Sequence, residues 1–298
     1  MNTIPEYLAQ LRIALAGADP ALMQDALYDA EEYLRSELAE HPEMTEAEVI
    51  AAVAGSYGAP EEVAAIYLDT EAKVQTALRA PPPPPRSSVL GRFFGVAADP
   101  KTYGAMFYSI LALATGIFYF TWVVTGISLS LGFSVIIIGI PFVILFLGSV
   151  RLLSLVEGRI VEVMLGERMP RRPVYADRDR PVLTRIGEMF TDPRTWSTLL
   201  YMLAMMPLGV LYFTLAVALL TTSVVLVVAP PLALFGAFDG WSLSGGWYGY
   251  WEPSTTLGVW ELPVAFACGV VLLFATLHLL RGIGRVHGAI AKQLLVKA

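Results

Sequence analysis

Aromatic side chains crowd one short stretch near the end of the chain, where they could contact a ligand. Within residues 239–260 they alternate with glycines, and the ligand-binding candidates are Trp241, Trp247, Tyr248, Trp251 and Glu252. Aromatic rings stack on ligands and attract cations, while glycine permits close backbone approach. Tryptophan and tyrosine also collect at membrane interfaces. The stretch is therefore either a ligand surface or an aromatic belt.

No arrangement of residue types in the sequence predicts catalysis, a metal site or a cofactor site. The chain has three histidines and one cysteine, and it contains no phosphate-binding loop, dinucleotide fingerprint or serine nucleophile elbow. The apolar tracts 102–150 and 195–238 carry no Asp, Glu, Lys, Arg or His. We expect Glu157 on a helix surface, and His278 and His287 in packing or interfacial hydrogen bonds, with proton or metal binding as the alternative.

Carboxylates instead dominate residues 1–80, which we call the acidic head. The head holds 15 Asp and Glu against 4 Lys and Arg, a net charge of −11, whereas the rest of the chain carries +5. Such a surface favours a basic partner. We therefore expect a cytoplasmic regulatory protein to bind the head, and the candidates for that contact are Asp25, Asp29, Glu31, Glu32, Gly58, Pro60 and Glu61.

Cap chemistry divides the acidic head into short helices. Gly17 can close a first helix, and Asp19 followed by proline starts a second that runs to about residue 40. Thr45 opens a third helix through a capping box, which Gly58 ends. Pro60 begins a fourth helix that reaches about residue 78. Apolar residues recur at helical spacing, so each helix has one face to bury.

Three segments of the head resemble the HAAS-type helical signalling domain of bacteria. They are residues 7–15, the acidic helix 25–34, and residues 56–64 with the specific turn Gly58-x-Pro60-Glu-Glu-Val-Ala. The resemblance covers about residues 4–72. It implies a cytoplasmic domain linked to gene regulation, and we expect no direct contact with nucleic acid.

A polyproline run, residues 81–85, joins the head to an apolar body through a linker and interfacial segment over residues 81–98. The uncharged tract 102–150 is long enough for two membrane spans, since each needs about 20 residues. We expect spans at 103–125 and 131–150 with an outer turn at 125–128. Gly139 and Pro141 break the second span at mid-depth and are hinge candidates.

The chain then repeats itself at an offset of 93. Asp192-Pro-Arg-Thr-Trp196 follows the pattern of Asp99-Pro-Lys-Thr-Tyr103, and residues 209–214 follow residues 116–121. Two hairpin repeats are predicted, 99–191 and 192–298, the second with an insert at 239–258. Both are expected to start inside, related by an axis along the membrane normal. In the second repeat Pro230 and Pro231 take the place of the earlier hinge proline.

Charge orients these spans. Residues 151–194 hold nine arginines, whereas residues 239–260 hold no base and the C-terminus is basic. Basic loops stay inside, so both termini are expected in the cytoplasm of a bacterial inner membrane. One full span is expected at 196–219, then a segment at 224–235 that re-enters, lies at the interface or extends the helix. A final span follows at 259–280. A polyanion-binding patch is the alternative role for Arg168, Arg171, Arg172, Arg178 and Arg180.

Motifs of the second repeat resemble the bacterial putative-sensor membrane domain. They are Thr195-Trp196, residues 199–201 and 207–213, the outer residues 240–247, and the closing pattern His278-Leu-Leu-Arg281…Arg285-Val-His287-Gly288. The resemblance covers about residues 95–297 and implies a sensor. Because no kinase, cyclase or DNA-binding module is present, its output would pass through another protein.

The composition, 56% hydrophobic and 15% charged, predicts an all-helical polytopic membrane protein with a small cytoplasmic helical bundle. The function we expect is a non-enzymatic sensor or regulator that relays an external or lipid signal to a cytoplasmic partner through the head. A transport or channel component and a membrane-remodelling scaffold are the alternatives. Membrane lipid is an expected partner, and a homo-oligomer is possible.

Overall fold

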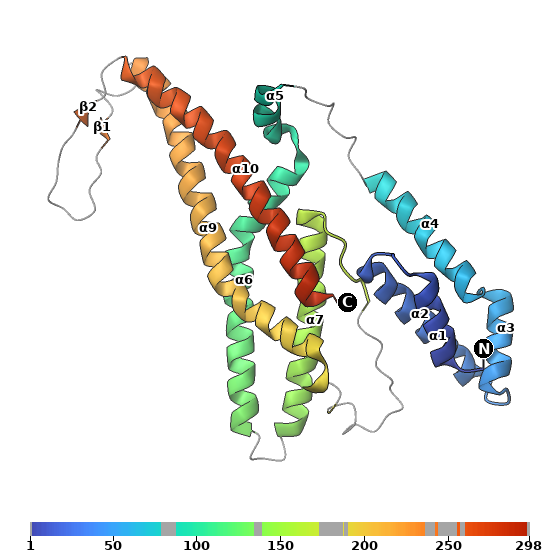
Figure 1. Cartoon of the computed structure of the whole chain (residues 1–298). Coiled ribbons are helices and arrows are strands. Elements are labelled where there is room, and N and C mark those ends of the chain that lie inside the picture. The colour runs from blue at the N-terminus through green and yellow to red at the C-terminus, as the bar shows by residue number, and fades with distance from the viewer. Residues whose placement is uncertain are drawn as a thin grey trace. The chain divides into compact units, whose positions relative to one another are not determined.

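The structure, a computed structural model, describes residues 2–78, 88–133, 139–172, 187, 190–235, 242–243, 255–256 and 260–296. Among these residues the elements are helical apart from one antiparallel pair of short strands, β1 (Ser242–Leu243) and β2 (Thr255–Thr256). The predicted all-helical class is confirmed (Figure 1). The chain divides into two compact units. The first comprises Met1–Pro83, Phe118–Ala204 and His287–Ala298, and the second comprises Pro84–Ile117 and Met205–Val286.

Helices α1 (Ile4–Ala14), α2 (Pro20–Glu40), α3 (Glu46–Ser56) and α4 (Pro60–Leu78) form the acidic head. Their ends lie where the cap residues predicted them. The Asp19 side chain accepts a hydrogen bond from the N–H of Ala21 at 2.9 Å, and Thr45 with Glu48 makes a complete capping box. Gly17 and Gly58 have positive φ angles of 89° and 117°, a backbone conformation that favours glycine.

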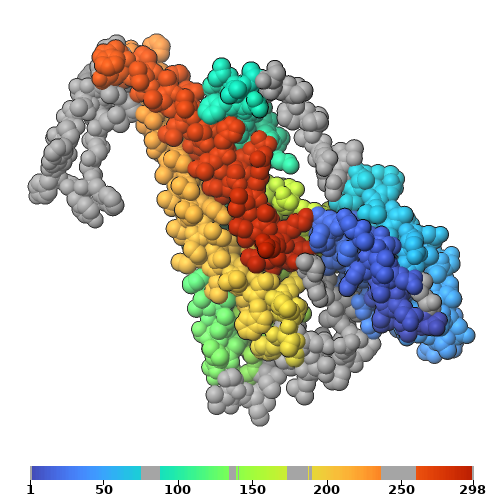
Figure 2. All heavy atoms as spheres, in the orientation of Figure 1, coloured from blue at the N-terminus to red at the C-terminus, as the bar shows by residue number. Residues whose placement is uncertain are grey.

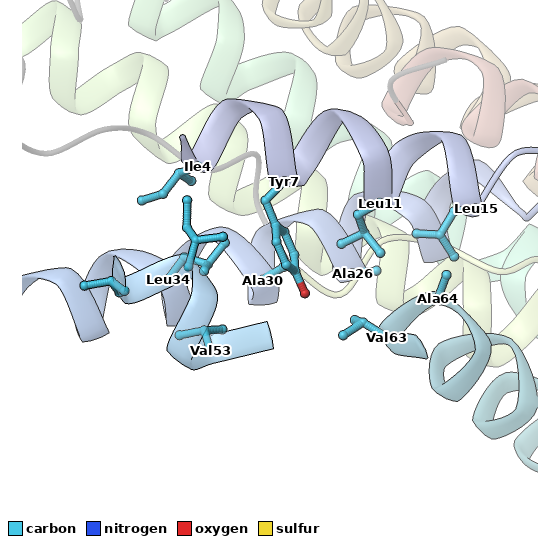
Figure 3. Close-up of a cluster of buried hydrophobic side chains, with 12 residues drawn as sticks. Ile4, Tyr7, Leu11, Leu15, Ala26, Ala30, Leu34, Val53, Val63 and Ala64 are labelled. Atoms are coloured by element: carbon cyan, nitrogen blue, oxygen red, sulfur yellow. The ribbon is translucent and has the colours of Figure 1, made fainter. Parts of the chain in front are cut away.

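The head has its own hydrophobic core, to which all of its helices contribute (Figure 3). The Tyr7 ring is fully buried at the centre, and its hydroxyl donates a hydrogen bond to the carbonyl oxygen of Gly58 at 2.8 Å. Burial raises the pKa of Tyr7 to about 12, so the phenol stays neutral. The other labelled core side chains are Ile4, Leu11, Leu15, Ala26, Ala30, Leu34, Val53, Val63 and Ala64.

Two glycines of the head should respond oppositely to alanine. Gly58→Ala is expected to lower the free energy of unfolding of the head by about 1–2 kcal/mol, because its φ is 117° and a Cβ would press on Val63. Gly55→Ala should raise it by up to about 1 kcal/mol, because Gly55 lies in α3 and nothing would meet its Cβ within 4 Å. Urea unfolding of residues 1–80 measures both changes. Equal effects would contradict this backbone assignment.

Four further helices are long and apolar enough to cross a membrane: α6 (Pro100–Phe133), α7 (Gly139–Leu165), α9 (Pro193–Leu234) and α10 (Glu261–Leu295). The predicted membrane protein is thereby confirmed. The outer turn predicted at 125–128 is wrong, since α6 continues through it. A Cβ at Gly126 would overlap the ring of Phe146, so this glycine makes room for a neighbouring helix and is not part of a turn.

Of the predicted hinge prolines, Pro141 occupies a different position from the one expected. Pro141 lies in the first turn of α7, where proline costs little, so it does not break a span at mid-depth. Pro230 and Pro231 lie near the end of α9, which is one helix of 42 residues. Of the alternatives for residues 224–235, the extended helix is the one observed up to Leu234. Whether any of these residues is a hinge stays a prediction.

Within the second unit, α6 and α9 cross at two glycines. A Cβ at Gly116 would overlap the backbone oxygen of Met205, and one at Gly209 would overlap that of Ala112. From Ala112 to Gly116 along α6, the contacted residue of α9 changes from Gly209 back to Met205. The two helices therefore cross antiparallel. The expectation that both run in the same direction is wrong. That expectation came from the positive-inside rule applied to the loops, whereas the direction of the crossing follows from the glycine contacts between the two helices.

The second unit also contains α5 (Val89–Phe94) and the 3₁₀ helix η1 (Gly95–Ala98). The Phe94 ring packs edge-on against Phe274 of α10, with centroids 4.7 Å apart. Asp99, directly before α6, forms an ion pair with Arg281 of α10. Figure 2 shows α9 and α10 packed together in this unit, where a Cβ at Gly269 would meet the backbone of Leu226.

Candidate functional site

The acidic face of α2 contacts the segment that follows α7, residues 166–172, which we call the arginine loop. Asp25 of α2 is 5% exposed. Its Oδ2 accepts a hydrogen bond from Nη2 of Arg168 at 2.9 Å. Its Oδ1 accepts hydrogen bonds from the backbone N–H groups of Arg171 at 2.7 Å and of Arg172 at 2.8 Å. One carboxylate of the head thus receives three donors from the loop.

Local backbone chemistry sets the arginine loop in place. Gly166 ends α7 with a φ of 75°, a left-handed turn that redirects the chain after Leu165. Met169, 1% exposed, then packs beside Gly158 of α7. The loop is therefore anchored on its own membrane helix on one side while its N–H groups face the head on the other.

Arg168 connects the head to α7 through a group of carboxylates. Its side chain is 10% exposed and lies 2.9 Å from Asp25 of α2, 3.6 Å from Glu71 of α4 and 3.6 Å from Glu162 of α7. Two of its guanidinium nitrogens, Nε and Nη1, have no hydrogen-bond partner among the described residues. Arg168 is therefore held by charge from both the head and α7.

Weaker contacts surround this centre. Arg172 pairs with Asp29 at 3.0 Å and lies over the ring of Tyr28. Gln24 donates to the carbonyl oxygen of Arg172 at 2.6 Å and accepts from Nη1 of Arg194 at 2.8 Å. Asp19 forms an ion pair with Lys292 near the end of α10. The head thus contacts the starts or ends of several membrane helices within the first unit.

A cavity of about 190 Å³ lies at this contact. Carboxylates and guanidinium groups both line it, so its charge is mixed. Each described arginine of the proposed polyanion patch is paired with an acid: Arg168 with Asp25, Arg171 with Glu162 and Arg172 with Asp29. Arg178 and Arg180 lie outside the described residues. The geometry therefore favours binding of the acidic head by the arginine loop over binding of a polyanion.

Burial raises the pKa of Asp25 above that of an ordinary aspartate, although the N–H donors of the loop and Arg168 act in the opposite direction. Removing this carboxylate from water therefore opposes the contact, while its three donors favour it. The two effects partly cancel.

A second polar cluster lies between the packed helices of the first unit. The hydroxyl of Tyr119 in α6 donates to Oε2 of Glu157 in α7 at 3.0 Å. The hydroxyl of Tyr201 in α9 lies 2.9 Å from Oε1 of Glu157 and 3.0 Å from Nε2 of His287 in α10. Glu157 and His287 are completely buried. The expectation that Glu157 lies on a helix surface is wrong, because neighbouring helices cover it.

The other candidates from the sequence are dispersed. Glu31 pairs with Arg35 along α2 at 3.0 Å, and Glu32 and Glu61 are exposed. Gly58 and Pro60 form the turn between α3 and α4. His278 lies 3.0 Å from the carbonyl oxygen of Phe93. The ligand-binding candidates Trp241, Trp247, Tyr248, Trp251 and Glu252 lie outside the described residues.

Sequence reasoning missed the pairing of the acidic head with the chain's own arginines, and it missed the buried cluster. Two signals could have found the cluster. Tyr119 and Tyr212 are equivalent at the offset of 93, and Glu157 and His287 are equivalent at an offset of 130, which also relates Arg151 to Arg281. Polar residues retained at equivalent positions of apolar helices point to a shared buried site.

Comparison with known proteins identifies one related family. A family described as "putative sensor" matches residues 108–295. No curated protein matches the chain. No solved structure matches it either. The family match covers the buried cluster and the arginine loop but not the acidic head.

Proposed function

Since the chain belongs to this putative-sensor family, we propose that it is a non-enzymatic bacterial membrane sensor that holds its acidic head on its own arginine loop until an external or lipid signal releases it. The helices long enough to span a membrane support the sensor's location. The contact of the head with Lys292, near the end of α10, supports both termini lying on the cytoplasmic side.

The observation that carries the proposal is the triple contact of Asp25. A buried carboxylate is costly unless it is paired, and here every described donor to it comes from the arginine loop. Release would expose Asp25 and Asp29 together on one face of α2. That face would then bind a basic surface of a cytoplasmic regulatory protein, with the chemistry that now binds the loop.

The HAAS-type resemblance of the head supports a signalling role for that face. The helix caps, the turn at Gly58 and the four-helix core agree with the segments on which the resemblance depends. In this view the loop and the partner compete for the same carboxylates, so the head would signal only when it is undocked.

We also propose that the membrane part is an internal duplication, and reciprocal contacts support it. Asp192 pairs with Arg151 at 3.1 Å, and the equivalent residues Asp99 and Arg281 pair with each other. The crossing of α6 and α9 is reciprocal too, because its two glycine contacts exchange under the offset of 93. A local two-fold axis between the two crossing helices would produce this pattern.

A peptide with the sequence of residues 166–172 tests the competition. Full-length Arg168→Ala in detergent micelles should bind the fluorescent peptide at least about tenfold more tightly than the wild type, because a docked head is available for only a small fraction of the time. Fluorescence anisotropy measures the binding. Asp25→Ala combined with Arg168→Ala should lose it. Equal binding by wild type and Arg168→Ala would count against the proposal.

A further inference from the structure

We propose that the buried cluster of Glu157, Tyr201 and His287 is a protonation site that binds one proton and thereby controls the arginine loop. The ligand of this site is the proton itself. The inference concerns the signal that acts on the sensor, so its last step, the coupling to the head, rests on the proposed function. The protonation site stands without that step.

Hydrogen counting shows why the cluster accommodates one more proton. Tyr201 has a single hydroxyl hydrogen but two partners, Oε1 of Glu157 and Nε2 of His287. When Glu157 is ionised, Tyr201 donates to it and accepts from the Nε2–H of a neutral His287. A proton added to the imidazole makes the ring cationic. Moving the Nε2 hydrogen to Tyr201 and the Tyr201 hydrogen to Glu157 then leaves a neutral ring and a neutral acid.

The two protonation states differ in buried charge. Before proton uptake the three residues together carry one negative charge, and afterwards, as a neutral acid and a neutral imidazole ring, they carry none. Net charge inside apolar helices is costly, so these two states should favour different packing of the helices around them. Ionisable residues in such helices are kept mainly for function.

The described contacts bring several titratable groups of this unit to Glu157 or to its neighbours. Tyr119 faces it from α6, Tyr201 from α9 and His287 through Tyr201 from α10. The arginine loop brings Glu167 against Gly288, the neighbour of His287. Further along α7, Arg151 is already paired with Asp192.

Two glycines connect the cluster to the arginine loop. A Cβ at Gly158, next to Glu157, would lie 3.4 Å from the side chain of Met169, and one at Gly288, next to His287, would overlap the side chain of Glu167. These two loop residues flank Arg168, which binds Asp25. A small shift of α7 against α10 therefore moves the loop residues on both sides of the arginine that holds the head.

Infrared difference spectroscopy of the full-length protein tests the site directly. Spectra recorded between about pH 4 and pH 9, which brackets ordinary carboxyl and imidazole groups, should show a carboxylic-acid band on acidification. Glu157→Gln should remove this band, whereas the control Glu40→Gln, at an exposed glutamate that ends α2, should keep it. Tyr201→Phe, which leaves Glu157 in place, should shift the midpoint by at least about one pH unit.

The outcomes separate the site from its coupling. Absence of a band that depends on Glu157, or an unchanged midpoint in Tyr201→Phe, overturns the protonation site. A band that titrates normally in Arg168→Ala supports a site that does not need the docked head. Carbodiimide cross-linking of Asp19 to Lys292 measures docking of the head at the same pH values. A cross-link yield that does not change with the carboxylic-acid band overturns the coupling of the site to the head but not the protonation site.

Discussion

Arg168→Ala is expected to reduce the cross-link between Asp19 and Lys292 to background in the full-length protein. Removing one partner of a buried ion pair costs about 3–5 kcal/mol, since the other charge is left buried and unpaired. Here the head can avoid that cost by undocking, which returns Asp25 to water. Carbodiimide joins carboxylates to amines that are in contact, and mass spectrometry of the joined peptides measures the yield.

The same sample contains its own control for this experiment. Asp69 and Lys73 form an ion pair within α4, so their cross-link reports the reagent and the folded head but not docking. Arg159→Ala is a matched variant, because Arg159 is an exposed arginine of α7 that pairs with Glu162 along the helix. An Asp19–Lys292 yield that survives Arg168→Ala would show that Arg168 does not hold the head.

Gly209→Ala should lower the free energy of unfolding of the membrane part by about 3 kcal/mol, the upper end of the usual cost of overpacking. Its Cβ would overlap the backbone oxygen of Ala112, and a backbone atom cannot turn aside as a side chain can. The α6–α9 crossing would have to separate. Thermal unfolding of the purified protein in detergent, followed by circular dichroism, should show a lower midpoint.

Alanine at Gly148 is the control for that result. Gly148 lies in the apolar helix α7, and nothing would meet its Cβ within 4 Å. This variant should be neutral or more stable by up to about 1 kcal/mol, since alanine favours a helix. Gly116→Ala should behave like Gly209→Ala, because the two glycines make reciprocal contacts. Similar midpoints for Gly209→Ala and Gly148→Ala would contradict the close crossing.

The folded head illustrates what local sequence determines. Its helix ends follow from Asp19, Thr45 and Gly58, whose side chains or backbone angles act on residues a few positions away. Hydropathy likewise identified the long apolar helices, because crossing a bilayer requires only length and apolarity. Features that depend on neighbouring residues or on composition can be predicted from the sequence without knowing the fold.

The turn predicted at 125–128 failed for the opposite reason. In lipid a helix satisfies all of its own backbone hydrogen bonds, so an apolar chain continues past Gly126 unless something forces it to stop. Gly126 instead leaves room for the ring of Phe146, a residue twenty positions away in the sequence. The presence of a glycine in the sequence does not distinguish a turn from a close contact between helices.

The sequence alone determined that an acidic helical head, with Asp25 and Asp29 on its second helix, is attached to apolar membrane helices. Only the tertiary structure decided that the partner in this state is the chain's own arginine loop, more than 140 residues away in sequence. It also decided that Glu157 is buried among tyrosines and His287. Both depend on which helix faces pack together, and this packing leaves no local signal in the sequence.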